Sequence, residues 1–172
     1  MTDYDDHPIS DLDTVDAARR YVMRSAMTKD GATCPCCQRL VRTYRYRVSR
    51  TQALFLIALA RASQAQGTGL QGCVDLRQVG GRFGAGVQLG GKYAKLRFWG
   101  LIARDPDHAA TWRLTPRGVA YLRGQPIPAY VYLLDNRHVG NSDTYSTISE
   151  ALQTAFDLDD ALQSPAGLPG RA

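Results

Sequence analysis

Three of the chain's four cysteines stand together in the stretch Cys34-Pro35-Cys36-Cys37, and the fourth is Cys73. Cys34 and Cys37 form a Cys-x-x-Cys pair, with Cys36 as a spare thiol between them. A gap of two residues lets two thiolates reach one ion from a single tight turn, as in structural zinc sites. The pattern therefore indicates a zinc site at Cys34 and Cys37, with Cys36 and Cys73 as further candidate ligands.

This candidate zinc site is incomplete in the sequence, because structural zinc takes four ligands and no second Cys-x-x-Cys pair occurs. Cys73, His108 or His138 can complete it only through the fold, and a second subunit can supply a matching pair. Two simpler interpretations stay open: a knuckle of thiols that has lost its metal, and a turn of small buried residues. A redox-active pair is disfavoured, because no thioredoxin-like strand and helix surround it.

The basic side chains of this 172-residue chain are concentrated in its middle. Residues 31–104 hold twelve Lys or Arg and one acid, Asp75, whereas residues 1–30 and 105–172 each carry a net charge of −3. The overall charge of +5 hides this pattern. A basic middle between acidic flanks favours a surface that binds a polyanion. The alternative is a solvated, arginine-rich surface.

The stretch from Lys92 to Gly118 organises the rest of the chain. Its apolar spacing predicts a helix over about Leu89–Trp99, stopped by Gly100. A strand then begins at Leu101, a polar turn covers 105–108, and a second strand contains Trp112 and Leu114. Thr115 and Pro116 begin the next helix as its N-cap and first residue.

Candidate nucleic-acid contacts lie in and around this stretch. The predicted helix would place Lys92, Lys95 and Arg97 toward a major groove. Arg82 and Arg104 are candidate phosphate contacts, and Arg113 would reach the minor groove or the backbone from the wing. His108, at the turn, is interpreted as a solvated turn residue.

A second basic run precedes the central helix, where Arg45 and Arg47 alternate with Tyr44 and Tyr46. Arginines can bind phosphates and tyrosines can stack on bases, so this run is another candidate contact, for RNA as well as DNA. It can equally be one exposed strand face beside the cysteines.

The motif KLRFWGLI…WRLTPRG, within residues 95–118, resembles the recognition helix and wing of MarR-like winged helix-turn-helix proteins. The resemblance covers about residues 49–123, and it implies a winged-helix fold, a duplex DNA partner and a homodimer. With its Cys-Pro-x-Cys motif, the chain is also similar to small uncharacterised phage-encoded winged-helix proteins, a group that implies no known activity.

We therefore expect an α+β fold with a winged helix-turn-helix core, an N-terminal helix, a Cys knuckle and a C-terminal strand–helix extension. The N-terminal helix should start at a Ser10 cap, the central one at a Ser49–Gln52 capping box and the last one at a Thr147–Glu150 capping box. In the extension we expect a strand over 129–134, a loop over 135–142, a helix over 148–156 and a solvated acidic end at 157–160. The predicted segments are 1–30 (acidic, with a helix), 31–48 (Cys knuckle and basic strand), 49–124 (winged helix), 125–163 (extension) and 164–172 (disordered tail).

These features predict a DNA-binding protein, either a transcriptional regulator or a phage-type accessory factor. The alternative is a protein–protein adaptor or inhibitor that docks on a host nucleic-acid enzyme. We find no nucleophile elbow, carboxylate pair or phosphate loop, so we do not expect an enzyme. No apolar run is long enough for a membrane, and the acidic first residues are unlike a secretory signal, so we expect a cytoplasmic protein.

Overall fold

The computed structural model describes residues 14–26, 30–77, 91–108 and 110–163. It is 42% helical and 23% strand, which confirms the predicted α+β class. The chain divides into two compact units: unit 1 is Met1–Tyr46 with Tyr132–Gly140, and unit 2 is Arg47–Val131 with Asn141–Ala172. None of the helices in the described ranges is both long and apolar enough to cross a membrane.

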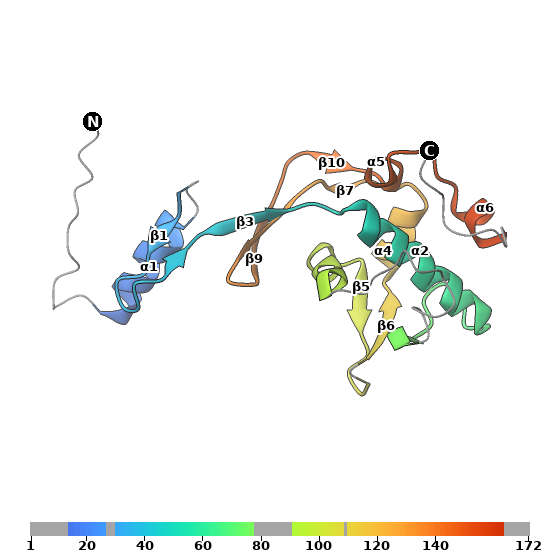
Figure 1. Cartoon of the computed structure of the whole chain (residues 1–172), viewed down its shortest axis with the longest axis horizontal. Helices are drawn as coiled ribbons and strands as arrows, with labels where there is room; N and C mark the ends of the chain where they lie inside the picture. The colour runs from blue at the N-terminus through green and yellow to red at the C-terminus, as the bar shows by residue number, and fades with distance from the viewer. Residues whose placement is uncertain (1–13, 27–29, 78–90, 109, 164–172) are drawn as a thin grey trace. The chain divides into compact units, whose positions relative to one another are not determined.

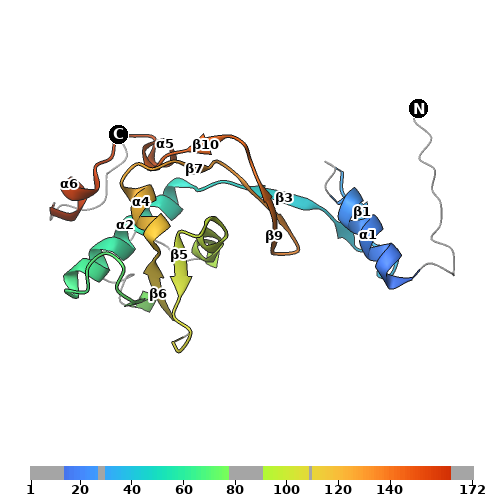
Figure 2. The same ribbon diagram turned by 180° about the vertical axis from the view of Figure 1, so that it is seen from behind.

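Unit 2 is organised around helix α2, Arg50–Ala65 (Figure 1). The predicted capping box is confirmed: the Ser49 hydroxyl accepts the Gln52 N–H at 3.3 Å, and the Gln52 side chain accepts the Ser49 N–H at 3.0 Å. Ten of its 16 residues are buried, so α2 lies in the middle of the core. Figure 2 shows its neighbours from behind: α4 (Pro116–Leu122), α5 (Ile148–Leu152) and α6 (Leu158–Gln163).

A three-stranded antiparallel sheet also contacts α2. Its order is β4 (Val74–Asp75), β6 (Thr111–Leu114) and β5 (Ile102–Arg104), so the last strand in the sequence lies between the other two. Trp112 and Leu114 of β6 are buried and Arg113 between them is exposed. The alternation predicted for this strand is therefore confirmed.

The predicted recognition helix differs in type from the expectation. Instead of an α-helix over Leu89–Trp99, the structure has a 3₁₀ helix, η1, over Gly91–Trp99; the first two predicted residues lie outside the described part. A 3₁₀ helix has three residues per turn, which brings Tyr93, Leu96 and Trp99 into one line. Leu96 and Trp99 are buried and Tyr93 is half-buried. Because these apolar residues are three positions apart, the 3₁₀ geometry places all of them on the side of η1 that faces the core.

Aromatic contacts attach η1 to the rest of unit 2. Tyr93 stacks on Phe55 of α2 with ring centroids 5.0 Å apart, and it meets Trp112 edge-on at 5.7 Å. The Trp99 indole N–H donates to the Pro128 carbonyl at 2.8 Å. These contacts tie η1 to α2, to β6 and to β7 (Ile127–Pro128).

The end of η1 and the start of α4 follow the prediction. Gly100 is left-handed, with φ +70°. Thr115 is the N-cap of α4 and Pro116 is its first residue. The Thr115 hydroxyl donates to the Gly100 carbonyl, and its oxygen accepts the Gly118 N–H at 3.0 Å. One side chain thus caps α4 and fixes it against the end of η1.

The structure corrects the helix bounds predicted for the C-terminal part of unit 2, whereas Asp157, Asp159 and Asp160 are exposed as expected. The helix expected over 148–156 is the shorter α5, because Gln153 turns left-handed at φ +59°. The acidic end expected over 157–160 begins helix α6, because the Asp157 carboxylate accepts the N–H groups of Asp159 and Asp160 at 2.8 and 3.0 Å. The extension also contains β7, which pairs antiparallel with β10 (Tyr145–Ser146).

The described residues of unit 1 form one helix and two small sheets. The helix begins at a Thr14 cap and not at Ser10, which lies outside the described residues. The basic strand predicted within residues 31–48 is divided into two strands. One sheet pairs β1 with β2, and the other has the order β3-β8-β9. The elements are α1 (Val15–Ser25), β1 (Ala32–Thr33), β2 (Leu40–Val41), β3 (Thr43–Tyr46), β8 (Val131–Leu134) and β9 (Arg137–Asn141).

The hairpin loop predicted over 135–142 is shorter than expected, because Arg137–Asn141 form strand β9. Asp135 and Asn136 take positive φ angles of 47° and 58°. Two successive left-handed residues form the tight turn that suits a two-residue hairpin, and Asp and Asn tolerate this conformation best among non-glycine residues. The turn lets β9 return along β8.

We expect Gly118→Ala to destabilise unit 2. A Cβ at Gly118 would overlap the main-chain carbonyl of Leu101, which cannot move aside as a side chain can. Overpacking of this kind costs about 1–3 kcal/mol. Urea denaturation of the variant should show this loss. The matched change Arg117→Ala, at an exposed neighbour, should alter the free energy of unfolding by less than about 0.5 kcal/mol. Equal stability of the two variants would contradict the prediction.

Candidate functional site

The exposed surface of η1 carries the first group of predicted contacts. Lys92 and Arg97 are exposed, whereas Lys95 is half-buried. With three residues per turn, Lys92 and Lys95 share one line along η1, and Arg97 stands on another. The Gln52 amide donates to the Lys92 carbonyl at 2.7 Å. Gln52, which belongs to the capping box of α2, thus also fixes the backbone from which Lys92 projects.

The Arg97 guanidinium lies 4.8 Å from the centre of the neighbouring Phe98 ring. A cation over an aromatic face is attracted electrostatically but keeps its charge and its N–H donors. This contact limits the directions in which Arg97 can point and leaves the group able to bind an anion.

The two arginines predicted for the wing lie on different faces of the β5–β6 hairpin. Both Arg104 and Arg113 are exposed. The register pairs Arg104 with Trp112, and Ala103 with Arg113. Directly paired residues share a face of the sheet, so Arg104 stands on the Trp112 face and Arg113 on the opposite face.

The turn of this hairpin is built on Asp105. Its carboxylate accepts the N–H groups of Asp107 and His108 at 2.9 and 3.2 Å, and it accepts the thiol hydrogen of Cys73. The hydrogen bond from the Asp107 N–H, followed by those from Cys73 and His108, lowers the pKa of Asp105. Burial and the nearby Asp105 raise the pKa of Cys73, while Arg113 opposes this shift. The His108 side chain is 75% exposed, as expected for a solvated turn residue.

The other predicted basic contacts fall in different parts of the chain. Arg45 is exposed on β3 in unit 1, and Arg47 is exposed at the start of unit 2. The rings of Tyr44 and Tyr46 lie 6.5 Å apart with a 40° tilt, and Arg42 lies over Tyr44 at 4.7 Å. Arg82 lies outside the described residues.

Three cysteines occupy the turn that joins β1 to β2, which we name the Cys turn (residues 34–38). The Gln38 N–H donates to the Cys34 carbonyl at 2.8 Å, and the Cys34 N–H donates to the Arg39 carbonyl at 2.9 Å. Gln38 is left-handed, with φ +57°, which closes the turn. The main-chain N–H groups of Cys37 and Cys36 point at the Cys34 sulfur, and these bonds lower the pKa of Cys34.

The predicted metal ligands are not assembled into one cluster. Cys34, Cys36 and Cys37 belong to unit 1, whereas Cys73 belongs to unit 2 and bonds to Asp105. Within residues 14–26, 30–77, 91–108 and 110–163, no three Cys, His, Asp or Glu side chains are grouped to hold a metal ion. Any metal held by the Cys turn therefore needs ligands from elsewhere.

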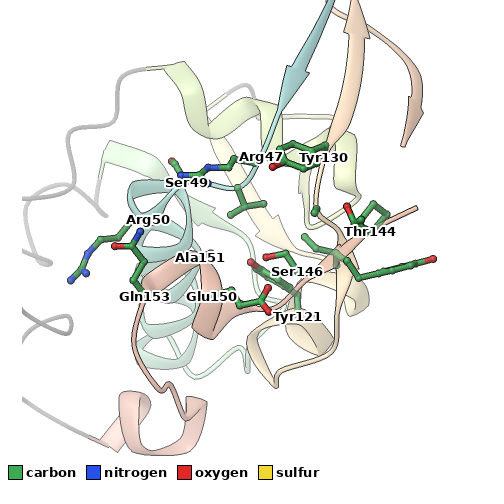
Figure 3. Close-up of a pocket in the computed structure, with 15 residues that line it drawn as sticks. Arg47, Ser49, Arg50, Tyr121, Tyr130, Thr144, Ser146, Glu150, Ala151 and Gln153 are labelled. Atoms are coloured by element: carbon green, nitrogen blue, oxygen red, sulfur yellow. The ribbon is translucent and has the colours of Figure 1, made fainter. Parts of the chain in front are cut away.

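A cavity of about 400 Å³, which the sequence did not suggest, lies in unit 2 between the start of α2, the β7–β10 pair and α5 (Figure 3). The Tyr121 hydroxyl donates to the Thr147 carbonyl at 3.2 Å, and the Glu150 carboxylate accepts the Thr147 N–H at 3.1 Å. Burial and the Glu150 charge raise the pKa of Tyr121. Arg50 donates to the Leu152 carbonyl at 3.0 Å. These groups bind one another and hold α5 in place, so we assign no reaction to the cavity. The only sequence signals near it are the two capping boxes.

Comparison with known protein families, curated proteins and solved structures finds no match to this chain.

Cys34 should react with an alkylating reagent several times faster than Cys73 at neutral pH. The thiolate is the nucleophile, and the main-chain bonds at Cys34 favour it, whereas slight desolvation and the Asp105 carboxylate disfavour it at the exposed Cys73. Peptide mass spectrometry over a time course of iodoacetamide labelling, with a phosphine reductant and a chelator, measures both rates.

Asp105→Asn is the matched control for this comparison. It removes the carboxylate charge that raises the pKa of Cys73 and leaves the Cys turn intact. The variant should speed labelling of Cys73 and leave the rate at Cys34 unchanged. Equal wild-type rates at the two thiols would contradict the prediction.

Proposed function

We propose that the chain is a DNA-binding protein, a transcriptional regulator or phage-type accessory factor, and that unit 2 is a MarR-like winged helix-turn-helix domain. The order of elements supports this: α2, β4, a helical start at Leu76, η1, β5, β6 and α4. In a winged helix, a short first strand pairs with the hairpin that forms the wing, as β4 does with β6. This order, together with exposed basic residues on η1, is the observation that carries the proposal.

The charge of the segment that includes η1 suits a polyanion. Residues 76–104 contain six Lys or Arg and no acid. A 3₁₀ helix rises about 2.0 Å per residue, so Lys92 and Lys95 are separated by ~6 Å along its axis. Two nucleotide steps along a DNA strand span about 7 Å. Lys92 and Lys95 are therefore spaced to reach two phosphates that lie two nucleotide steps apart on one strand. Arg97, on its separate line, is our candidate for a base contact.

The β5–β6 hairpin is the proposed wing. Arg104 and Arg113 stand on its opposite faces, so a hairpin that enters a groove presents one cation to each side. Contacts of this type go to phosphates, which position the protein without reading the sequence. Affinity should then depend strongly on salt, because each phosphate contact releases condensed counterions.

The proposal predicts salt-sensitive binding that depends on Lys92 and Arg97. With about four phosphate contacts, affinity for a mixed-sequence duplex should fall ~100-fold between about 50 and 200 mM salt. The double variant Lys92→Glu/Arg97→Glu should bind at least about tenfold more weakly at the lower salt, with a shallower salt dependence. Fluorescence anisotropy measures both, and circular dichroism confirms that the variant is folded.

The matched control is Arg19→Glu/Arg20→Glu, which changes the net charge equally at two exposed positions of α1 in unit 1. This control should retain most of the affinity. Equal losses in the two double variants would mean that net charge alone drives binding, against a specific role of η1. A wild-type protein that fails to bind DNA at low salt would contradict the proposal and favour the protein–protein adaptor.

A further inference from the structure

The Cys turn has the residue spacing of half a tetrahedral metal site. It is a closed β-hairpin turn, fixed by the main-chain bonds of Cys34 with Gln38 and Arg39. The Cys34–Cys37 spacing lets one turn supply two thiolates to one ion.

The other two ligands are not supplied by the described residues of the same chain. No third or fourth metal-binding side chain is grouped with this pair within the described ranges. Cys73 is engaged with Asp105 in unit 2. A two-fold axis through the ion would bring in the same pair from a second copy and complete four sulfur ligands with no further residue type.

The exposed apolar side chains of unit 1 also favour a second copy of the chain as the partner. Six large apolar or aromatic side chains are exposed in the described residues, and unit 1 holds five of them. They are Val15, Tyr21 and Met23 on α1, Leu40 on β2 and Tyr44 on β3. Leu40, 62% exposed, lies two residues beyond the Cys turn. Soluble chains usually cover such side chains with a partner when they are this concentrated.

The interior of unit 1 is small for the chain it must hold. Among the described residues of unit 1, the buried side chains are Ala18, Ala26, Ala32, Leu133 and Leu134. Three alanines and two leucines bury little apolar area, so much of the stabilisation must come from other contacts. Small units of this kind usually depend on a metal or on association for stability.

We propose that two copies of the chain associate through unit 1 around one shared zinc ion, with Cys34 and Cys37 of each copy as the four ligands. Cys36 lies outside the ligand set. Each of the four thiols releases its proton to solvent on binding, so the Zn(Cys)₄ centre carries a net charge of −2. Arg39, which directly follows the turn, contributes two positive charges in the dimer, one from each copy. The proposal does not rest on DNA binding.

The test uses the full chain, stripped of metal with a chelator under reducing conditions and then titrated with zinc. Metal analysis should give one zinc per two chains, and light scattering should show monomer converting to dimer at that ratio. Removing the zinc should weaken the dimer on the order of 100-fold or more. Cobalt in place of zinc should give the intense visible absorption of a tetrahedral four-thiolate site.

Three single variants complete the test. Cys34→Ser should lose both the metal and the dimer, whereas Cys36→Ser, in the same turn, and Cys73→Ser should keep both. Chelation of the wild type gives the same readout if Cys34→Ser does not fold. One zinc per monomer, dimerisation independent of zinc, no zinc bound at stoichiometric concentration, or equal loss in Cys36→Ser would each overturn the proposal.

Discussion

Unit 2 depends on the contacts that Tyr93, Leu96 and Trp99, aligned on one side of η1, make with the core. They pack η1 against α2 through Phe55 and against β6 through Trp112, and the Trp99 indole reaches β7. Because the anchors recur every three residues, the intervening positions are forced outward, and Lys92 and Arg97 are exposed there. The same burial that stabilises the unit thus sets which basic side chains can meet a partner.

Signals confined to a few neighbouring residues were enough to predict much of unit 2. The Ser49–Gln52 and Thr147–Glu150 capping boxes, the Gly100 stop and the Thr115–Pro116 start each act through local hydrogen bonds, and each is present. The type of η1 escaped prediction because helical spacing of three or four residues fits both helix types. The choice was made by contacts with Phe55 and Trp112, which lie far away in the sequence.

Predictions that needed long-range pairing fared worse. Residues 135–142 look like a polar loop, yet they hold a tight turn and a strand that pairs with β8 in the sheet that also contains β3. β8 ends at Leu134, directly before this turn, but nothing near Asp135 in the sequence indicates that β3 completes the sheet. The opposite faces of Arg104 and Arg113 likewise follow from the register between β5 and β6. The cavity beside Tyr121 could not be predicted from the sequence, because its walls come from segments about 100 residues apart.

The two proposals draw on different side chains, which makes them compatible. Zinc-linked association would use the Cys turn and the apolar residues of unit 1, and DNA binding would use η1 and the hairpin of unit 2. Cys73 belongs to the second group, since its thiol bonds to the carboxylate that builds the hairpin turn. Its position explains why four cysteines do not make one four-cysteine site. Three serve the turn in unit 1, whereas the fourth is part of the hydrogen bonding that shapes the proposed wing.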